Sequence, residues 1–392
     1  MAHKWKSALA ALWLSIWCAN AAMAEIGVSD KEILIGNPNA QSGDNQFSGK
    51  QTTIGIQTYI DDVNAEGGVN GRKIRLITCD DKYEVDGAFS CFQQLLGDNV
   101  FAITGLVGSA LLAKYIPLCT NNKMPLVGAY SGPQFVTTPA KRYIFTTRLG
   151  YRDEEQQFVD HMFRDADIKK IGIIYQNDSY GADHLQGLTD ALKKYNTQVV
   201  AAASYKRNTL DVADAFNMVK AANPQAVSLA ANNRQCAAII KMAHDANWHP
   251  VFFINSGANV DGFLQSVGKE ADGVLVSETV PSPNKTDVPL IAKYQKALKQ
   301  YYPGEQPCFT SLRGYIDGLV LVEGLKRAGK DLTREKFVEA LYGINKVDIG
   351  LGKGLELNYG QEDHAGLHRY AFGIVSNGHL APVVWKNIKP AK

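Results

Sequence analysis

The sequence predicts an α/β protein of two lobes, each a doubly wound, mostly parallel sheet covered by helices on both faces. Short apolar strands alternate with amphipathic helices along most of the chain, which is the pattern of such sheets. The alternation restarts once, after residue 145. The chain of 392 residues is also longer than a single hydrophobic core usually accommodates.

The first run of the pattern extends from residue 32 to residue 145. Strands are expected over residues 32–36, 73–78, 101–104 and 125–127, and helices over 54–63, 88–96 and 111–118. Between the first helix and the second strand, the stretch Gly67-Gly68-Val69-Asn70-Gly71 predicts a turn, because glycine and asparagine interrupt regular structure.

The second run contains the same alternation. Strands are expected over residues 170–175, 199–203, 226–229 and 251–254, and helices over 156–163, 185–195, 212–222 and 236–246. A strand-like crossing over residues 274–280 leads to helices over 288–301, 309–328 and 334–342, and the tail contains strand-like segments such as 370–375. In open sheets of this kind, ligands bind outside the carboxyl ends of the strands. The loops that follow the strands are therefore where a site is expected.

The first 24 residues are expected to be a cleaved secretory signal peptide. Lys4 and Lys6 supply its positive start, and residues 7–17 form an apolar stretch. That stretch is shorter than the roughly 20 residues that cross a bilayer. Ala22-Met23-Ala24 fits the small-x-small cleavage pattern, which makes Glu25 the first mature residue. We therefore expect a soluble, periplasmic protein.

The mature chain is electrically balanced. Without Lys4 and Lys6, the 41 lysines and arginines fall to 39, which equals the 39 acidic residues. Neutralisation of phosphates dominates the affinity of proteins for nucleic acids, and this chain has no basic runs that could supply it. We expect no nucleic-acid partner.

Five cysteines follow the expected cleavage site: Cys79, Cys91, Cys119, Cys236 and Cys308. They form no CxxC pair and no Cys/His zinc spacing, so no metal site is expected. The secretory route permits disulfides, and the odd number leaves at least one thiol free. Cys18 raises the alternative of a lipidated first residue, but the bulky Ile16 and Trp17 precede it where lipoprotein signals have small residues.

Several segments together resemble a known family. They are residues 59–74 (YIDDVNAEGGVNGRKI) followed by Asp80-Asp81, then Ile103-Thr104-Gly105, residues 128–133 (GAYSGP) and residues 175–181 (YQNDSYG). On these segments and its signal peptide, the chain resembles the periplasmic solute-binding proteins of branched-chain amino-acid-type ABC transporters, the leucine/isoleucine/valine-binding group. The resemblance covers essentially the whole mature chain.

The resemblance implies the type I periplasmic binding fold, in which three crossover segments join two lobes around a ligand cleft. It places the crossings near Arg148, Glu278 and Gly352. One lobe would then comprise residues 25–148 and 278–352, and the other residues 149–277 and 353–392. It also implies capture of a small solute by hinge closure, delivery to membrane permease subunits that work with a separate ATPase, and no cofactor. We expect a monomer.

The candidate ligand residues of the first lobe are Ser109, Ala129, Tyr130 and Ser131. Ser109 begins a predicted helix, where unpaired N–H groups and the positive end of the dipole suit a carboxylate. A plain N-cap serine is the alternative. The resemblance implies that Ser109 holds the ligand carboxylate, that residues 129–131 present a backbone carbonyl and a hydroxyl, and that Tyr130 lines or narrows the pocket. The alternative for residues 128–133 is an ordinary turn.

The candidates of the second lobe are Tyr180, Asn232 and Ser256. The resemblance implies that Tyr180 closes on the ligand. Asn232 and Ser256 depart from the family pattern, which often has a tyrosine at the first position and an acid near the second to pair with the ligand ammonium. Burial of an ammonium without a charged partner is costly. The departure therefore favours a carboxylate or amide ligand without an ammonium, such as a small organic or aromatic acid, with an amino acid as the alternative. Arg148 and Arg234 are further sources of charge, although structural or solvated roles suit both.

In the topology implied by the resemblance, Cys91 and Cys119 lie on successive helices over one sheet face. We expect this pair to form a disulfide, with two separate buried thiols as the alternative.

No catalytic motif is present. The chain has no GxSxG, HExxH or P-loop pattern, and the glycines of residues 350–354 lack dinucleotide-binding spacing. Asp153-Glu154-Glu155 is interpreted as the acidic first turn of a helix. We expect a binding protein and not an enzyme, with a periplasmic sensor or an exported hydrolase of the same architecture as alternatives.

Overall fold

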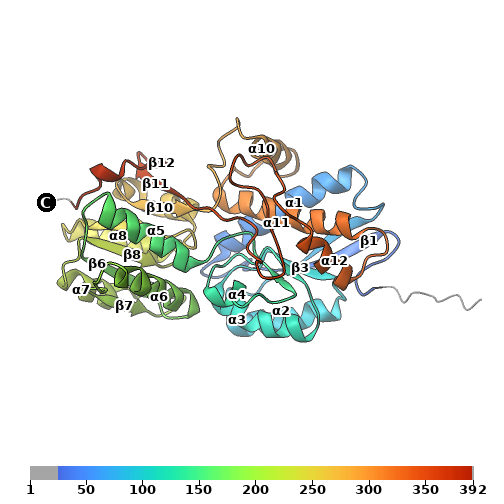
Figure 1. Ribbon diagram of the computed structural model, residues 1–392, viewed down its shortest axis with the longest axis horizontal. Coiled ribbons are helices and arrows are strands. Elements are labelled where there is room, and N and C mark those ends of the chain that lie inside the picture. Colours follow the sequence, from blue (N-terminus) through green and yellow to red (C-terminus); the bar gives the residue numbers. More distant parts are fainter. Residues whose placement is uncertain (1–24, 391–392) are drawn as a thin grey trace, which may run out of the picture.

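The computed structural model describes residues 25–390, so the expected signal peptide over residues 1–24 lies outside the described part. The chain forms two lobes, each built around one sheet (Figure 1). This confirms the predicted two-lobed α/β class. Among the helices of residues 25–390, none is long and apolar enough to cross a membrane.

The first lobe contains a five-stranded parallel sheet in the order β2-β1-β3-β4-β5. Its strands are β1 (Glu32–Pro38), β2 (Lys73–Cys79), β3 (Ala102–Thr104), β4 (Leu126–Val127) and β5 (Ile144–Phe145). Its helices are α1 (Gln46–Ala65), α2 (Val85–Gly97), α3 (Ser109–Asn121), α4 (Gln134–Thr137), α10 (Pro289–Tyr301), α11 (Phe309–Ala328) and α12 (Arg334–Tyr342). In Figure 1, α2 and α3 lie below this sheet, and α1 and α11 lie above it.

Helices α1 and α11 pack backbone to backbone although they are far apart in the sequence. A Cβ atom at Gly55 would lie 1.9 Å from the carbonyl oxygen of Ser311, and one at Gly314 would lie 2.3 Å from that of Thr52. Only glycine permits this approach. The contact joins the N-terminal and C-terminal parts of the lobe.

The second lobe contains a seven-stranded sheet in the order β12-β11-β10-β9-β8-β6-β7. Its strands are β6 (Ile171–Gln176), β7 (Ala202–Tyr205), β8 (Ala226–Ala230), β9 (Val251–Ile254), β10 (Leu275–Glu278), β11 (Ala371–Ser376) and β12 (His379–Pro382). Its helices are α5 (Tyr151–Arg164), α6 (Ser179–Lys193), α7 (Ala213–Ala221), α8 (Asn233–Asp245) and α9 (Val260–Val267), with the 3-10 turns η1 (Gly268–Ala271) and η2 (Trp385–Asn387). Strands β6 to β10 are parallel, and β11 and β12 are antiparallel.

Three segments cross between the lobes. The first joins β5 to α5 through residues 146–150, and the second joins β10 to α10 through residues 279–288. Before the third crossing, Ala365 still pairs with Thr146 in the first lobe, and the Gly366 N–H donates to the Thr146 carbonyl (2.8 Å). The third crossing therefore follows at residues 367–370, beyond the Gly352 region where the resemblance placed it. There the Tyr370 hydroxyl lies 2.8 Å from the Leu149 carbonyl oxygen, so the third crossing runs beside the first.

The expected Cys91–Cys119 disulfide is wrong. Cys91 on α2 is joined instead to Cys79 at the end of β2, with a Cα–Cα distance of 5.7 Å. The short loop after β2 turns α2 back against that strand. This places Cys91 beside Cys79 at the strand end rather than beside Cys119 on α3. Cys119 is a free, buried thiol in the core formed by α2, α3 and the sheet, and burial raises its pKa.

Candidate ligand-binding cleft

The strand-end loops of the two lobes enclose a small cavity of about 10 Å³. It is lined by Asn45, Tyr83, Val107, Gly108, Ser109, Tyr130, Ser131, Tyr151, Tyr180, Asn232 and Gly257. None of these lining residues is charged, and four of them are tyrosines. Five of the seven candidate residues line the cavity, and Ala129 and Ser256 lie outside the lining.

A chain of hydroxyl groups runs from Ser109 and Ser131 of the first lobe to Tyr151 of the second. The Ser109 and Ser131 Oγ atoms are hydrogen bonded at 2.6 Å, and Ser131 Oγ lies 3.0 Å from the Tyr151 hydroxyl. The N-cap of α3 is Gly108, so Ser109 is its first helical residue rather than a capping serine. The first N–H groups of a helix have no partner within it. This end of the cavity therefore offers hydrogen-bond donors and the positive end of a helix dipole.

Ala129 lies outside the cavity lining and holds the loop of Ser131 in place through its backbone carbonyl. It is fully buried, and its carbonyl oxygen accepts hydrogen bonds from the Thr146 hydroxyl (2.7 Å) and the Ser131 N–H (3.0 Å). The carbonyl that the resemblance assigns to the ligand is thus engaged within the lobe, where it fixes the loop that carries Ser131.

Tyr130 joins the two lobes across the cavity. Its hydroxyl donates to the carbonyl oxygen of Ser256 in the second lobe at 2.8 Å. The guanidinium carbon of Arg313 lies 4.3 Å from the centre of the Tyr130 ring, and that of Arg148 lies 5.6 Å away. Burial raises the pKa of Tyr130, so its phenol remains a neutral hydrogen-bond donor.

A buried network of charges lies beneath Tyr130. Arg148 donates to the Ser256 Oγ (2.7 Å) and approaches Glu154 (3.5 Å), while Arg313 donates to Glu278 (2.8 Å). Glu154 also accepts from the Ser256 N–H at 2.7 Å. Both arginines are almost fully buried, and Arg148 acts as a support for Ser256 rather than as a lining residue. Glu154 is thus an interior acid, although the sequence indicated only a first-turn carboxylate.

Tyr180 forms part of the second-lobe wall. Asp178 caps α6 by accepting from the Tyr180 N–H at 2.9 Å, which fixes the start of the helix. The Tyr180 hydroxyl donates to Asn255 Oδ1 (2.6 Å), and its ring packs edge-on against Tyr151, with centroids 5.3 Å apart. The residue that receives this hydrogen bond is therefore an amide, where an acid would be required to hold an ammonium.

The remaining candidates of the second lobe have different positions. Asn232 lines the cavity and precedes α8, with its side-chain amide 3.4 Å from the side-chain oxygen of Gln176. Arg234 is half-exposed and pairs with Asp44 of the first lobe at 2.5 Å. This ion pair connects the two lobes at the edge of the cleft, and Arg234 does not line the cavity.

Two lining tyrosines were missed in the sequence. Tyr83 follows β2 with a left-handed backbone (φ 59°), and the guanidinium carbon of Arg207 from the second lobe lies 4.3 Å from its ring centre. Tyr151 is the first residue of α5, immediately after the first crossing. Their positions after a strand end and after a crossing are the signals that could have indicated them.

Further hydrogen bonds hold the lobes together around the cavity. The Asn259 side-chain amide of the second lobe donates to Ser48 Oγ of the first at 2.9 Å. The Gln134 N–H donates in the opposite direction to Asp183 Oδ2 at 3.2 Å. With the Tyr130–Ser256 and Arg234–Asp44 contacts, these bonds define a closed arrangement of the two lobes.

Residues 32–379 match the family model described as periplasmic binding protein. The chain belongs to this family. Leu/Ile/Val-binding protein homolog 8 of Brucella abortus (strain 2308) is 23% identical over 336 residues, which cover 82% of this chain and 83% of that protein. The match confirms the resemblance inferred from the sequence, and the family is a class of solute-binding proteins rather than enzymes.

Solved structures share the architecture. A possible leucine/isoleucine/valine-binding protein from Rhodopirellula baltica SH 1 has a TM-score of 0.86 at 26% identity, covering 93% of this chain and 99% of that one. LivJ from Streptococcus pneumoniae str. Canada MDR_19A, a branched-chain amino acid transporter substrate binding protein solved with isoleucine, has a TM-score of 0.77 at 18% identity, covering 89% and 98%. These neighbours support the type I periplasmic binding fold.

Proposed function

We propose that this protein is the periplasmic, monomeric substrate-binding component of an ABC transporter, and that it captures a small carboxylate and delivers it to permease subunits in the inner membrane. The observation that carries the proposal is the convergence of strand-end loops from both lobes on one cavity between three crossings. Closure of two hinged lobes on a solute is a common way to sequester a ligand without chemical change.

The ligand class follows from the chemistry of the lining. The Ser109 and Ser131 hydroxyls and the first turn of α3 supply donors for a carboxylate. None of the lining residues carries a charge that could pair with an ammonium. The tyrosine rings provide an apolar, aromatic enclosure with hydroxyl groups at its edge. The chemistry of this lining suits a small aromatic or aliphatic acid better than a free amino acid. The lobes must part to admit either, because the cavity of about 10 Å³ holds no more than about one water molecule in this closed arrangement.

The test compares ligands that differ only in the ammonium. Purified protein is heated with 3-phenylpropanoate or phenylalanine, and with 4-methylpentanoate or leucine. Ligand at a hundredfold excess over its dissociation constant adds about 2.7 kcal/mol to the stability of the folded state. We expect the acids to raise the unfolding temperature and the amino acids to raise it less. Stabilisation by the amino acids alone would contradict the proposed ligand class.

A further inference from the structure

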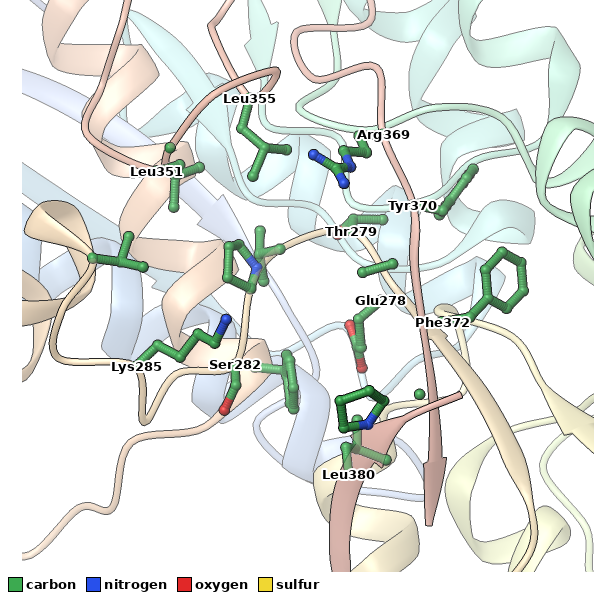
Figure 2. A pocket seen from close by; sticks show the side chains of 18 of the residues that line it. Glu278, Thr279, Ser282, Lys285, Leu351, Leu355, Arg369, Tyr370, Phe372 and Leu380 are labelled. Carbon is green, nitrogen blue, oxygen red and sulfur yellow. The ribbon is translucent and has the colours of Figure 1, made fainter. Parts of the chain in front are cut away.

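A second cavity of about 450 Å³ lies beside the second and third crossings between the lobes (Figure 2). Sites for small organic ligands generally enclose about 300 to 1,000 Å³. Residues 279–288 of the second crossing form one wall, and residues 351–355 and 369–373, which flank and include part of the third crossing, form another. Residues 380–382 of β12 complete it. This cavity shares no lining residue with the cleft between the lobes.

The body of the cavity is apolar. Its walls include Val280, Val288, Leu351, Leu355, Phe372 and Leu380. Val280, Leu351 and Leu355 are buried, while Phe372 and Leu380 are partly exposed towards the cavity and solvent. Such a surface favours an apolar ligand body, because each apolar group that leaves water stabilises the complex.

A buried carboxylate lies on the inner wall, and one of its oxygens is unpaired among the residues that the structure describes. The side chain of Glu278 is 4% exposed, and its Oε2 accepts from Arg313 at 2.8 Å. Its Oε1 has no hydrogen-bond partner within residues 25–390. Figure 2 shows the Glu278 carboxylate directed into the cavity, between Thr279 and Leu380. Buried polar atoms are nearly always paired, and an unpaired one costs about 1–3 kcal/mol.

The mouth of the cavity is positively charged. Lys285, Lys353 and Arg369 are exposed residues of its lining. In Figure 2 the side chains of Lys285 and Arg369 approach the cavity from two sides. A cationic ligand would be repelled at this entrance, whereas an anionic group would be attracted to it.

We propose that this cavity is a second binding site, for a small anion with an apolar body and an uncharged hydrogen-bonding head such as a primary amide. The head lies against Glu278 Oε1, the body lies against the leucine and phenylalanine side chains, and the anionic group remains at the mouth near Lys285 and Arg369. A primary amide both donates and accepts, so it pairs with Oε1 whether or not Glu278 carries a proton. The two sites share no lining residue, so occupation of this cavity does not require a ligand in the cleft.

The test uses the monoamide of adipic acid as the probe, with hexanoate and hexanamide as comparators. With the cleft occupied by saturating 3-phenylpropanoate, isothermal titration calorimetry on the whole protein is expected to show hexanoate binding to this cavity about tenfold more weakly than the probe, because Oε1 then stays unpaired. Hexanamide is expected to bind about threefold more weakly, since it lacks the charge that exposed cations attract. Only the second difference should shrink in about 1 M salt.

Two further measurements locate the probe. In spectra of the unaltered protein with labelled leucine and valine methyl groups, the probe should shift the signals of Val288, Leu351 and Leu355. Leu380→Trp should fill the cavity and lower affinity at least tenfold, whereas His379→Trp, the adjacent residue of β12 outside the lining, should leave affinity unchanged. The proposal is overturned if those methyl signals do not move, or if a correctly folded Leu380→Trp variant binds the probe as well as the parent protein.

Discussion

The hydroxyl of Tyr130 in the first lobe donates a hydrogen bond of 2.8 Å to the carbonyl oxygen of Ser256 in the second. Both residues contact the buried charges beneath the cleft. The face of the Tyr130 ring packs against Arg313. Ser256 accepts a hydrogen bond from Arg148 and donates one to Glu154. The bond thus connects the binding loops of one lobe to the interior of the other. It forms in the closed arrangement and should contribute to the stability of that arrangement.

Tyr130→Phe removes this hydrogen bond while it retains the ring. The closed state should lose about 1 kcal/mol, which weakens the affinity for 3-phenylpropanoate about fivefold. X-ray scattering of the ligand-free variant should also show a larger radius of gyration. Tyr195→Phe is the matched control, because the Tyr195 hydroxyl bonds to Asp160 within one lobe (2.7 Å). Equal effects of the two substitutions would contradict a role in closure.

Ser131→Ala tests the hydroxyl chain. Ser131 Oγ contacts both Ser109 and Tyr151, so its loss removes one carboxylate donor and releases two others. Titration calorimetry should show about a tenfold loss of affinity for 3-phenylpropanoate, in the range of a hydrogen bond to a charged group. Ser90→Ala, on the exposed face of α2, should leave affinity unchanged. An unchanged affinity in Ser131→Ala would argue that the carboxylate binds elsewhere.

The Cys79–Cys91 disulfide should stabilise the first lobe. It closes a short loop with a sequence separation of 12, for which chain entropy predicts about 3 kcal/mol. Addition of a reductant should lower the free energy of unfolding in urea by that amount. The double variant Cys79→Ala/Cys91→Ala should start lower and show no response to reductant. Peptide mapping without reduction should join Cys79 to Cys91, and a Cys91–Cys119 peptide would contradict the structure.

The stability of the protein should decrease as the pH rises from about 6.5 to about 8. Burial raises the pKa of Glu155 to about 8 and lowers the pKa of His184, its partner at 2.8 Å, to about 4. In this window the folded protein keeps a proton on Glu155 that the unfolded chain has lost. His184 is neutral in the folded protein, but in the unfolded chain it still holds about half a proton at pH 6.5 and little by pH 8, which offsets part of the effect at the lower end of the window. Because the folded state binds more protons, the free energy of unfolding falls with rising pH.

Glu155→Gln should flatten this dependence by up to about 1.4 kcal/mol per pH unit, measured by urea unfolding at pH 6.5, 7 and 8. Part of the slope should remain, because burial also raises the pKa of Glu278 to about 8 and that of Asp81 to about 7. Glu270→Gln, an exposed residue, serves as the control and should keep the full slope. If Glu155→Gln kept the full pH dependence of the free energy of unfolding, the proton that the folded state retains would belong to another group.

The alternation of apolar strands and amphipathic helices was sufficient to predict both sheets, because parallel strands require helical connections of that length. It was insufficient for the short edge strands β5 and β12, because β5 has only two residues and β12 is only partly buried and carries little apolar signal. The Asn377-Gly378 pair, with φ values of 50° and 75°, marks the hairpin between β11 and β12 and was overlooked.

The cleft was predictable where a residue follows a strand directly. Ser109, Tyr130, Ser131, Tyr180 and Asn232 all lie after strand ends and all line one cavity. Tertiary contacts decided the rest. Whether Glu154 faces water or accepts hydrogen bonds from Ser256 and Ser277 depends on the path of distant chain segments, and local sequence does not encode that path. The cysteine pairing depended in the same way on how far α2 folds back along β2.

The glycine-mediated contact between α1 and α11 also constrains the order in which the chain can mature. Residues of α1 emerge early during synthesis, but their packing partner follows more than two hundred residues later. The middle section, from α5 to β10, holds most of one lobe in a continuous stretch and can collapse sooner. A chain synthesised from its N-terminus therefore passes through an interval in which the apolar face of α1 is uncovered, and a chaperone that shields it would be most needed then.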